Sequence, residues 1–195
     1  SAKKYGLKVG IYYSPADSYM EKKGVWGNNS ARVERTIPTL VKNDDRAGKV
    51  ASGKLPTFKY KATDYGAYML NQLYELLTEY GDISEVWFDG AQGNTAGTEH
   101  YDYGVFYEMI RRLQPQAIQA NAAYDARWVG NEDGWARQTE WSPQAAYNDG
   151  VDKVSLKPGQ MAADGKLGSM SSVLSEIRSG AANQLHWYPA EVDAK

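Results

Sequence analysis

The residue best placed for chemistry is Asp89, which follows the apolar run Val86-Trp87-Phe88 and precedes Gly90. A carboxylate at the tip of a strand is held by rigid backbone and can act as a nucleophile or a base. Asp-Gly is also a common turn pair, so a turn or capping role is an equally good interpretation of Asp89 taken alone.

Further acidic side chains lie C-terminal to Asp89. Residues 124–134 contain Asp125, Arg127, Trp128, Glu132 and Asp133, and Glu140 stands beside Trp141. For any one of these residues, a solvated charged loop is the simpler interpretation. Two carboxylates at adjacent strand ends nevertheless suit cleavage of a glycosidic bond, because one must be ionised and the other protonated. Burial beside aromatic side chains raises the pKa of a carboxyl and favours its protonated form.

Two more positions are less specific candidates. Tyr13 ends an expected strand, where its hydroxyl can face a site, although strand tyrosines more often pack in the interior. Glu191 follows the last expected strand and is interpreted either as a site residue or as an exposed side chain.

Hydrophobic patterning predicts the elements that must position these residues. Strands are predicted over 7–13, 83–90, 117–120 and 185–188, and helices over 64–80, 103–113 and 171–182. Asp64 is expected to cap the first helix, and Gly81 to follow its C-terminus. In residues 14–63 the apolar residues do not recur at the spacing of a helix or a strand, and this segment is expected to form a long, functional loop.

Alternation of strands and helices predicts a parallel α/β fold. A doubly wound nucleotide-binding sheet would carry a glycine-rich phosphate loop, and neither Gly-x-Gly-x-x-Gly nor a P-loop occurs. A (β/α)₈ TIM barrel places its chemistry on loops after the strands, as here, but needs about 250 residues. We therefore expect residues 1–195 to be a single partial barrel, roughly the middle half, with its N- and C-terminal parts absent or supplied as a separate segment.

Composition excludes several classes of site. The chain has 195 residues, no cysteine and two histidines, which excludes disulfides and a thiol nucleophile and argues against a metal site. A net charge of −2 gives no electrostatic reason to expect a nucleic-acid or membrane partner. Its 24 aromatic residues (6 Trp, 15 Tyr and 3 Phe) suit sugar binding as well as protein interfaces.

Four segments together resemble one enzyme family. They are residues 5–17 (YGLKVGIYYSPAD), 85–91 (EVWFDGA), 110–115 (IRRLQP) with 125–132 (DARWVGNE), and 186–193 (HWYPAEVD). In this order they resemble the α-L-fucosidases of glycoside hydrolase family 29, and the third is similar to the subfamily selective for α-1,3/1,4-linked fucose.

The resemblance implies a retaining enzyme that acts on fucosylated glycans without a cofactor, in an extracellular or periplasmic compartment. It implies that Asp89 is the nucleophile and Glu132 the general acid and base. It also implies that Tyr13 and Arg127 line the fucose pocket, to which we expect Trp128, Glu140 and Glu191 to contribute. In the other subfamily the acid has a Thr-x-Glu-aromatic context, which Glu140 partly matches.

The sequence also departs from the family. The paired histidines of an earlier strand and the segment expected after Asp193 have no counterpart, and residues 19–61 are longer than expected. A carbohydrate-binding barrel without activity and a retaining hydrolase acting on another sugar therefore remain alternatives.

Overall fold

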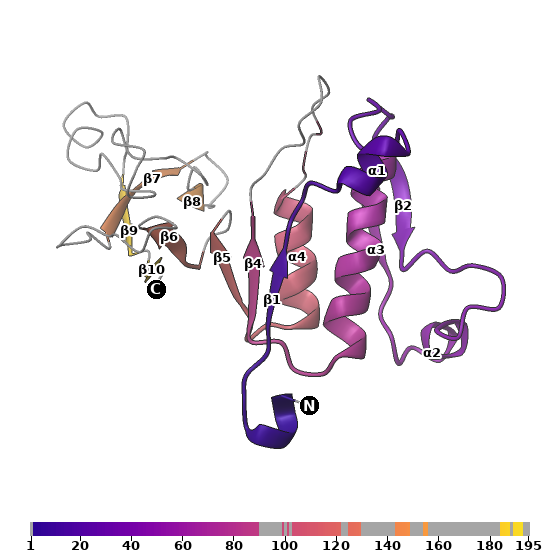
Figure 1. The fold of residues 1–195 in the computed structure, drawn as a ribbon, viewed down its shortest axis with the longest axis horizontal. Coiled ribbons are helices and arrows are strands. Elements are labelled where there is room, and N and C mark those ends of the chain that lie inside the picture. The colour runs from indigo at the N-terminus through magenta and orange to yellow at the C-terminus, as the bar shows by residue number, and fades with distance from the viewer. Residues whose placement is uncertain are drawn as a thin grey trace. The chain divides into compact units, whose positions relative to one another are not determined.

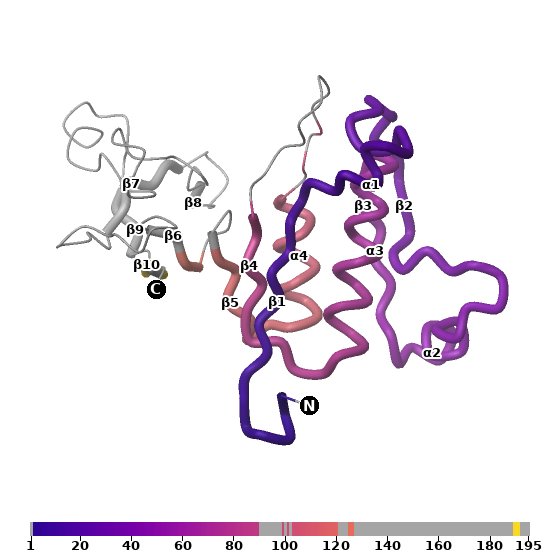
Figure 2. The backbone as a smooth tube through the Cα atoms, in the orientation of Figure 1, coloured from indigo at the N-terminus to yellow at the C-terminus, as the bar shows by residue number. Residues whose placement is uncertain are grey.

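The structure is a computed structural model that describes residues 2–89, 99, 101, 103–121, 125–129, 143–148, 154–155, 184–187 and 189–192. The chain divides into two compact units. Unit 1 comprises residues 1–86 and 90–117, and unit 2 comprises residues 87–89 and 118–195. Figure 2 traces the backbone through the described segments.

The helices are η1 (Ala2–Tyr5, a 3-10 helix), α1 (Ser18–Lys22), α2 (Ala47–Ala51), α3 (Asp64–Glu79) and α4 (Tyr103–Leu113). The strands are β1 (Gly10–Tyr13), β2 (Val33–Ile37), β3 (Phe58–Ala62), β4 (Glu85–Phe88), β5 (Ile118–Asn121), β6 (Arg127–Val129), β7 (Pro143–Asn148), β8 (Val154–Ser155), β9 (Gln184–Trp187) and β10 (Ala190–Val192). In the part of the chain that the structure describes, no helix is long and apolar enough to cross a membrane.

Helix α3 forms the centre of unit 1. Its apolar residues recur every three or four positions and are fully or almost fully buried: Tyr65, Met69, Leu70, Leu73, Tyr74 and Leu77. The N-cap is Thr63, whose Oγ1 accepts from the Gly66 amide at 2.9 Å. The expectation that Asp64 caps the helix is therefore wrong by one residue. Gly81 follows the helix with φ +82°, a left-handed conformation that glycine adopts without steric cost.

Helix α4 packs against α3 and has the predicted bounds. Gln114, just after α4, ties both helices to the segment between α3 and β4. Its Nε2 donates to the carbonyls of Leu77 at 2.7 Å and Gly81 at 2.9 Å, and its Oε1 accepts from the Ile83 amide at 3.2 Å. Gln114 is buried, and these bonds satisfy its amide there.

Strands β1, β4 and β5 form one sheet in the order β1-β4-β5. In Figure 1, β1 and β4 lie side by side and run in the same direction, while α3 returns in the opposite direction. This is the parallel strand-helix-strand arrangement that the sequence predicts. β4 alternates in burial, with Val86 and Phe88 fully buried, and Asp89 follows it directly.

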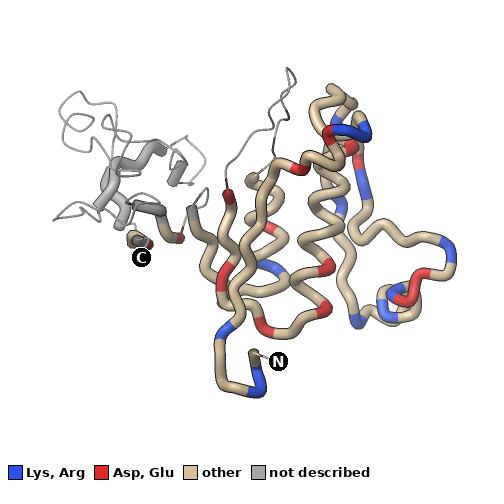
Figure 3. The backbone as a smooth tube through the Cα atoms, viewed as in Figure 1, with Lys and Arg blue, Asp and Glu red and all other residues tan. Residues whose placement is uncertain are grey.

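Residues 14–63 are not the structureless loop that we expected. They contain two short helices and the antiparallel pair β2–β3, whose register runs from Val33↔Ala62 to Ile37↔Phe58. The missed signal is the alternation of β3, in which Phe58, Tyr60 and Ala62 are buried while Lys59 and Lys61 are exposed. Basic and acidic residues are interspersed along this part of the chain (Figure 3).

Unit 2 contains both parallel and antiparallel strand pairs. β6 pairs with β10 in parallel, whereas β7 pairs with β8 and β9 in antiparallel orientation. The predicted strand 185–188 is present as β9, but its antiparallel pairing differs from the parallel arrangement that we expected. β7 was missed because its sequence PQAAYN contains no β-branched residue and resembles a loop. The predicted helix over 171–182 lies outside the described residues.

Candidate active site

Asp89 lies at the C-terminal end of β4, partly exposed. Alternation along β4 turns Val86 and Phe88 into the interior and leaves Trp87 on the opposite face. The indole Nε1 of Trp87 donates to Glu191 Oε2 at 3.0 Å. Two residues before the candidate nucleophile, β4 is thus hydrogen-bonded to β10.

Strands β6 and β10 bring further candidate residues together. In their parallel register Ala190 pairs with Arg127, and Glu191 pairs with Trp128. Arg127 and Trp128 are therefore part of a strand, whereas the sequence suggested a charged loop. The backbone of three predicted substrate-binding residues, Arg127, Trp128 and Glu191, meets at this pair of strands.

Asp125 closes the connection from β5 to β6. Its Oδ2 accepts from the Gln119 amide at 2.8 Å, and its own amide donates to the Gln119 carbonyl at 3.0 Å. A parallel bridge between Ala120 and Ala126 continues this connection. Residue 125, two positions before Arg127, is thus fixed to β5 at Gln119 by both its carboxylate and its amide.

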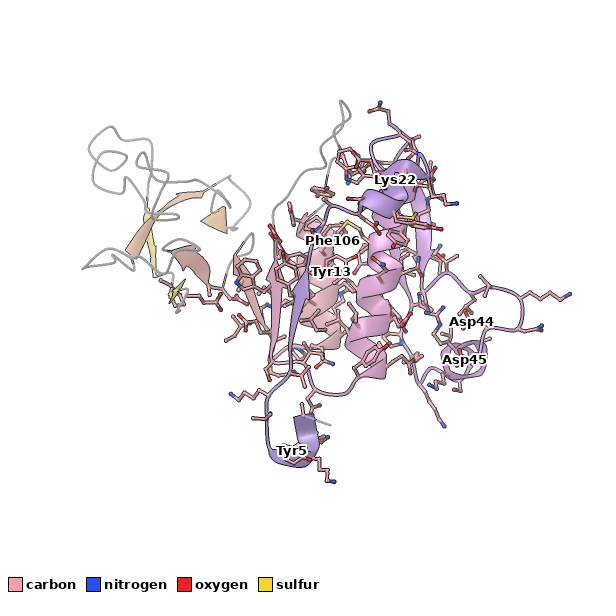
Figure 4. The ribbon with its side chains drawn as sticks, viewed as in Figure 1. Tyr5, Tyr13, Lys22, Asp44, Asp45 and Phe106 are labelled. Atoms are coloured by element: carbon pink, nitrogen blue, oxygen red, sulfur yellow. The ribbon has the colours of Figure 1, made fainter. Side chains whose placement is uncertain are left out.

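Tyr13, at the end of β1, is described within unit 1. Its side chain is 9% exposed, and its hydroxyl donates to Gln72 Oε1 of α3 at 2.6 Å (Figure 4). Burial, with smaller effects of nearby Tyr68 and Asp17, raises the pKa of Tyr13 far above its usual value. The phenol therefore stays neutral at any physiological pH. The assignment of Tyr13 to the fucose pocket stays a prediction.

Glu132 and Glu140, the two candidates for the acid, lie outside the described residues. Among the residues that the structure does describe, no group of three or more His, Cys, Asp or Glu side chains is arranged to hold a metal ion.

Glu99 was missed by sequence reasoning. It is 7% exposed, with Oε1 accepting from the Thr63 hydroxyl at 2.9 Å and Oε2 accepting from the Gly27 amide at 2.8 Å. Nearby, Trp26 Nε1 donates to the Tyr101 hydroxyl at 2.8 Å. These bonds join Glu99 to the N-cap of α3 and to Gly27, and they join Tyr101 to Trp26. No local pattern reveals them, because the partners are 36 to 75 residues apart.

Comparison with known proteins identifies the family. The family model described as alpha-L-fucosidase matches residues 1–151. The chain belongs to the alpha-L-fucosidase family. The curated Alpha-L-fucosidase 1 of Arabidopsis thaliana is 43% identical over 83 residues, which are 42% of this chain and 16% of that protein.

Solved structures agree with this membership. A crystal structure assigned as an alpha-L-fucosidase from Bacteroides ovatus is 30% identical with a TM-score of 0.56, and the match covers 99% of this chain and 27% of that one. A glycoside hydrolase 29 family member from a rumen bacterium is 26% identical with a TM-score of 0.51. This match also covers 99% of this chain and 27% of the other one. The chain therefore spans about a quarter or less of the length of these relatives. The family predicted from the four sequence segments is confirmed.

Proposed function

We propose that the protein containing this chain is an exo-acting α-L-fucosidase that removes terminal fucose from glycans with retention of configuration. One observation carries the proposal. In a chain of this family, Asp89 stands at the carboxyl end of β4, and the same strand is hydrogen-bonded through Trp87 to Glu191. In a (β/α)₈ barrel this end of a strand is where catalytic residues are found, and we propose that β1, β4 and β5 are part of such a barrel.

The proposed reaction has two displacements. Asp89 attacks the anomeric carbon while Glu132 protonates the departing glycosidic oxygen, which gives a fucosyl ester of Asp89 and a free aglycone. Glu132, now ionised, takes a proton from water, and the water oxygen attacks the same carbon. Fucose leaves with its original anomeric configuration, and both carboxyl groups regain their starting states.

The remaining candidates would bind the sugar. Arg127 carries fixed donors that suit sugar hydroxyls or a carboxylate, and Trp128 offers an aromatic face. We propose that these two residues, with Tyr13, Glu140 and Glu191, line the pocket. Similarity of residues 125–132 to the subfamily selective for α-1,3/1,4 linkages supports the same preference here, and the glycan substrate supports an extracellular or periplasmic location.

Replacing the nucleophile tests the function. In the full-length protein, Asp89→Ala should lower turnover of an aryl α-L-fucoside at least about 10³-fold, because no fucosyl ester can form. Asp82→Asn, a change at a side chain that is 86% exposed, is the matched surface control. A wild-type protein that binds fucose in calorimetry but hydrolyses no aryl fucoside would instead be a binding protein. In a wild-type enzyme, proton NMR of the first-formed fucose should show the α-anomer.

Azide rescue separates the two candidates for the acid. Glu132→Ala should slow hydrolysis, and added azide should restore turnover by trapping the intermediate as a fucosyl azide, because azide needs no general base. Glu140→Ala should show no such product. Formation of the azide only with Glu140→Ala would transfer the role to Glu140.

A further inference from the structure

Asp125 lies in unit 2, where β5 and β6 come together. Its Oδ2 accepts from the Gln119 amide at 2.8 Å, and its own amide donates to the Gln119 carbonyl at 3.0 Å. The Ala126 amide donates to the same carbonyl at 3.3 Å, and Ala120 and Ala126 form a parallel bridge. Both main-chain groups of Gln119 therefore bind to residues 125 and 126.

The Asp125 carboxylate takes the place of a main-chain acceptor. In a regular parallel ladder the Gln119 amide would donate to a carbonyl oxygen of the neighbouring strand. Here a side-chain oxygen accepts instead, at a distance typical of a good hydrogen bond. Gln119 is 2% exposed, so this bond satisfies a main-chain donor that is shielded from water.

The two bonds of Asp125 fix the register of β6 on β5. Ala126 lies opposite Ala120 because residue 125 is held beside Gln119. β6 is three residues long, so one additional bond is a large part of what sets its register. Since side chains alternate along a strand, a slip of one residue would exchange the two faces of β6.

The register of β6 also determines what its second neighbour, β10, meets. In this parallel pair Glu191 lies opposite Trp128, and the Glu191 carboxylate accepts from Trp87 Nε1 at 3.0 Å. Trp87 stands two residues before Asp89. Asp125 is thus the first member of a series of contacts, all within unit 2, that ends beside the proposed nucleophile in the sequence.

We propose that Asp125 is a positioning residue for sugar binding, which fixes the register of β6 and thereby the places of Arg127 and Trp128 in the fucose pocket. The inference rests on the proposed function, because Arg127 and Trp128 are proposed to bind the sugar. Asp125 acts through the main chain of β6 and not by contact with the substrate.

Asp125→Ala and Asp125→Asn separate the acceptor from the charge. Alanine removes the oxygen that binds the Gln119 amide, whereas asparagine keeps a carbonyl oxygen at the same distance from the main chain. Hydrogen exchange of the full-length protein, resolved to single amides, reads the ladder directly. The amides of Gln119 and Ala126 should exchange at least about tenfold faster in Asp125→Ala than in the wild type, and asparagine should restore most of the protection.

Kinetics of the full-length enzyme test the consequence for binding. Asp125→Ala should raise KM for an aryl α-L-fucoside about tenfold and change kcat less, because displaced binding residues weaken ground-state and transition-state binding alike. Asp125→Asn should stay within about twofold of the wild type. In an Arg127→Ala background, Asp125→Ala should raise KM at most about threefold, because one of the residues that it displaces is already absent.

Two further variants complete the design. Asp82→Ala, a change at a side chain that is 86% exposed, is the matched surface control and should leave both KM and the exchange of the Gln119 amide unchanged. Asp125→Ser replaces Asp125→Ala if the alanine variant does not fold, because a serine hydroxyl is too short to reach the Gln119 amide.

Three outcomes would overturn the inference. One is unchanged exchange at Gln119 and Ala126 in Asp125→Ala, which would show that the carboxylate does not hold the ladder. Another is an Asp125→Asn variant that loses as much as Asp125→Ala, because the charge would then matter and not the acceptor. The third is a full KM penalty in the Arg127→Ala background, which would indicate a general loss of structure.

Failure of the fucosidase proposal would look different. The wild type would then be inactive, while hydrogen exchange at Gln119 would still respond to Asp125→Ala. That result would leave Asp125 as the residue that sets the register of β6 and would end the sugar-binding part of the inference.

Discussion

The hydrogen bond between Trp87 Nε1 and Glu191 Oε2 joins residues 104 positions apart. Trp87 is separated from Asp89 only by the fully buried Phe88, so its indole is held close to the residue on which the proposed chemistry depends. Glu191 was expected to bind substrate directly. Its contact with Trp87 gives it a second role, that of fixing an aromatic side chain two residues before the proposed nucleophile.

The hydrogen bond between Trp87 and Glu191 predicts how substitutions of Glu191 change activity. Glu191→Ala removes the acceptor from a partly buried indole N–H and should reduce kcat/KM for an aryl fucoside about tenfold, since an unpaired buried donor costs about 1–3 kcal/mol. Glu191→Gln keeps an acceptor oxygen and should retain most of the activity. The measurement is steady-state kinetics with both variants. Equal losses for Gln and Ala would mean that the charge of Glu191, rather than its bond to Trp87, matters.

Among the elements, α3 is capped by a residue that makes bonds on both sides, Thr63. The Thr63 hydroxyl accepts from the Gly66 amide and donates to Glu99, so one side chain both caps the helix and binds a carboxylate that is distant in sequence. Gly66 leaves room for this arrangement, because an added Cβ would lie 3.2 Å from Thr63 Oγ1.

Thr63→Ala should therefore lower the free energy of unfolding by about 1–2 kcal/mol, the usual cost of losing an N-cap. Loss of the donor to Glu99 should add to this cost. Thr63→Ser keeps the hydroxyl and should stay within about 0.5 kcal/mol of the wild type. Urea unfolding of both variants measures the difference. A Thr63→Ala variant as stable as Thr63→Ser would show that the hydroxyl bonds contribute nothing.

The same elements show what the sequence can predict and why. In α3, α4 and β4 the spacing of apolar residues indicates the type of element. Gly81, Pro115 and Gly90 follow these elements, so the residues that end them indicate the same boundaries as the apolar spacing. β6 has only three residues and is stabilised by its partner β10, which lies 61 or more positions away. Pairing over such separations leaves no local signal, and for the same reason the Trp87–Glu191 bond could not be predicted.

On the scale of the whole molecule, buried tyrosine is a recurrent feature. The chain has 15 tyrosines, and burial raises the pKa of those at positions 13, 60, 65, 68, 74 and 101. In the unfolded chain these phenols lose their protons near pH 10, whereas the folded chain keeps them to higher pH. Above pH 10 the unfolded state therefore binds fewer protons, and stability falls as pH rises.

Tyr60 allows this effect to be tested with one hydroxyl. Desolvation raises its pKa from 10.0 to about 12, and among the described residues its buried hydroxyl has no hydrogen-bond partner. Tyr60→Phe removes both the unsatisfied group and its ionisation. At pH 7 the variant should be as stable as the wild type or more stable, because a buried polar group is replaced by an apolar one of the same shape. Between pH 10 and 12 its stability should fall less steeply. Urea midpoints measured from pH 7 to 11 give both results, and a variant less stable than the wild type at pH 7 would show that the hydroxyl is satisfied after all.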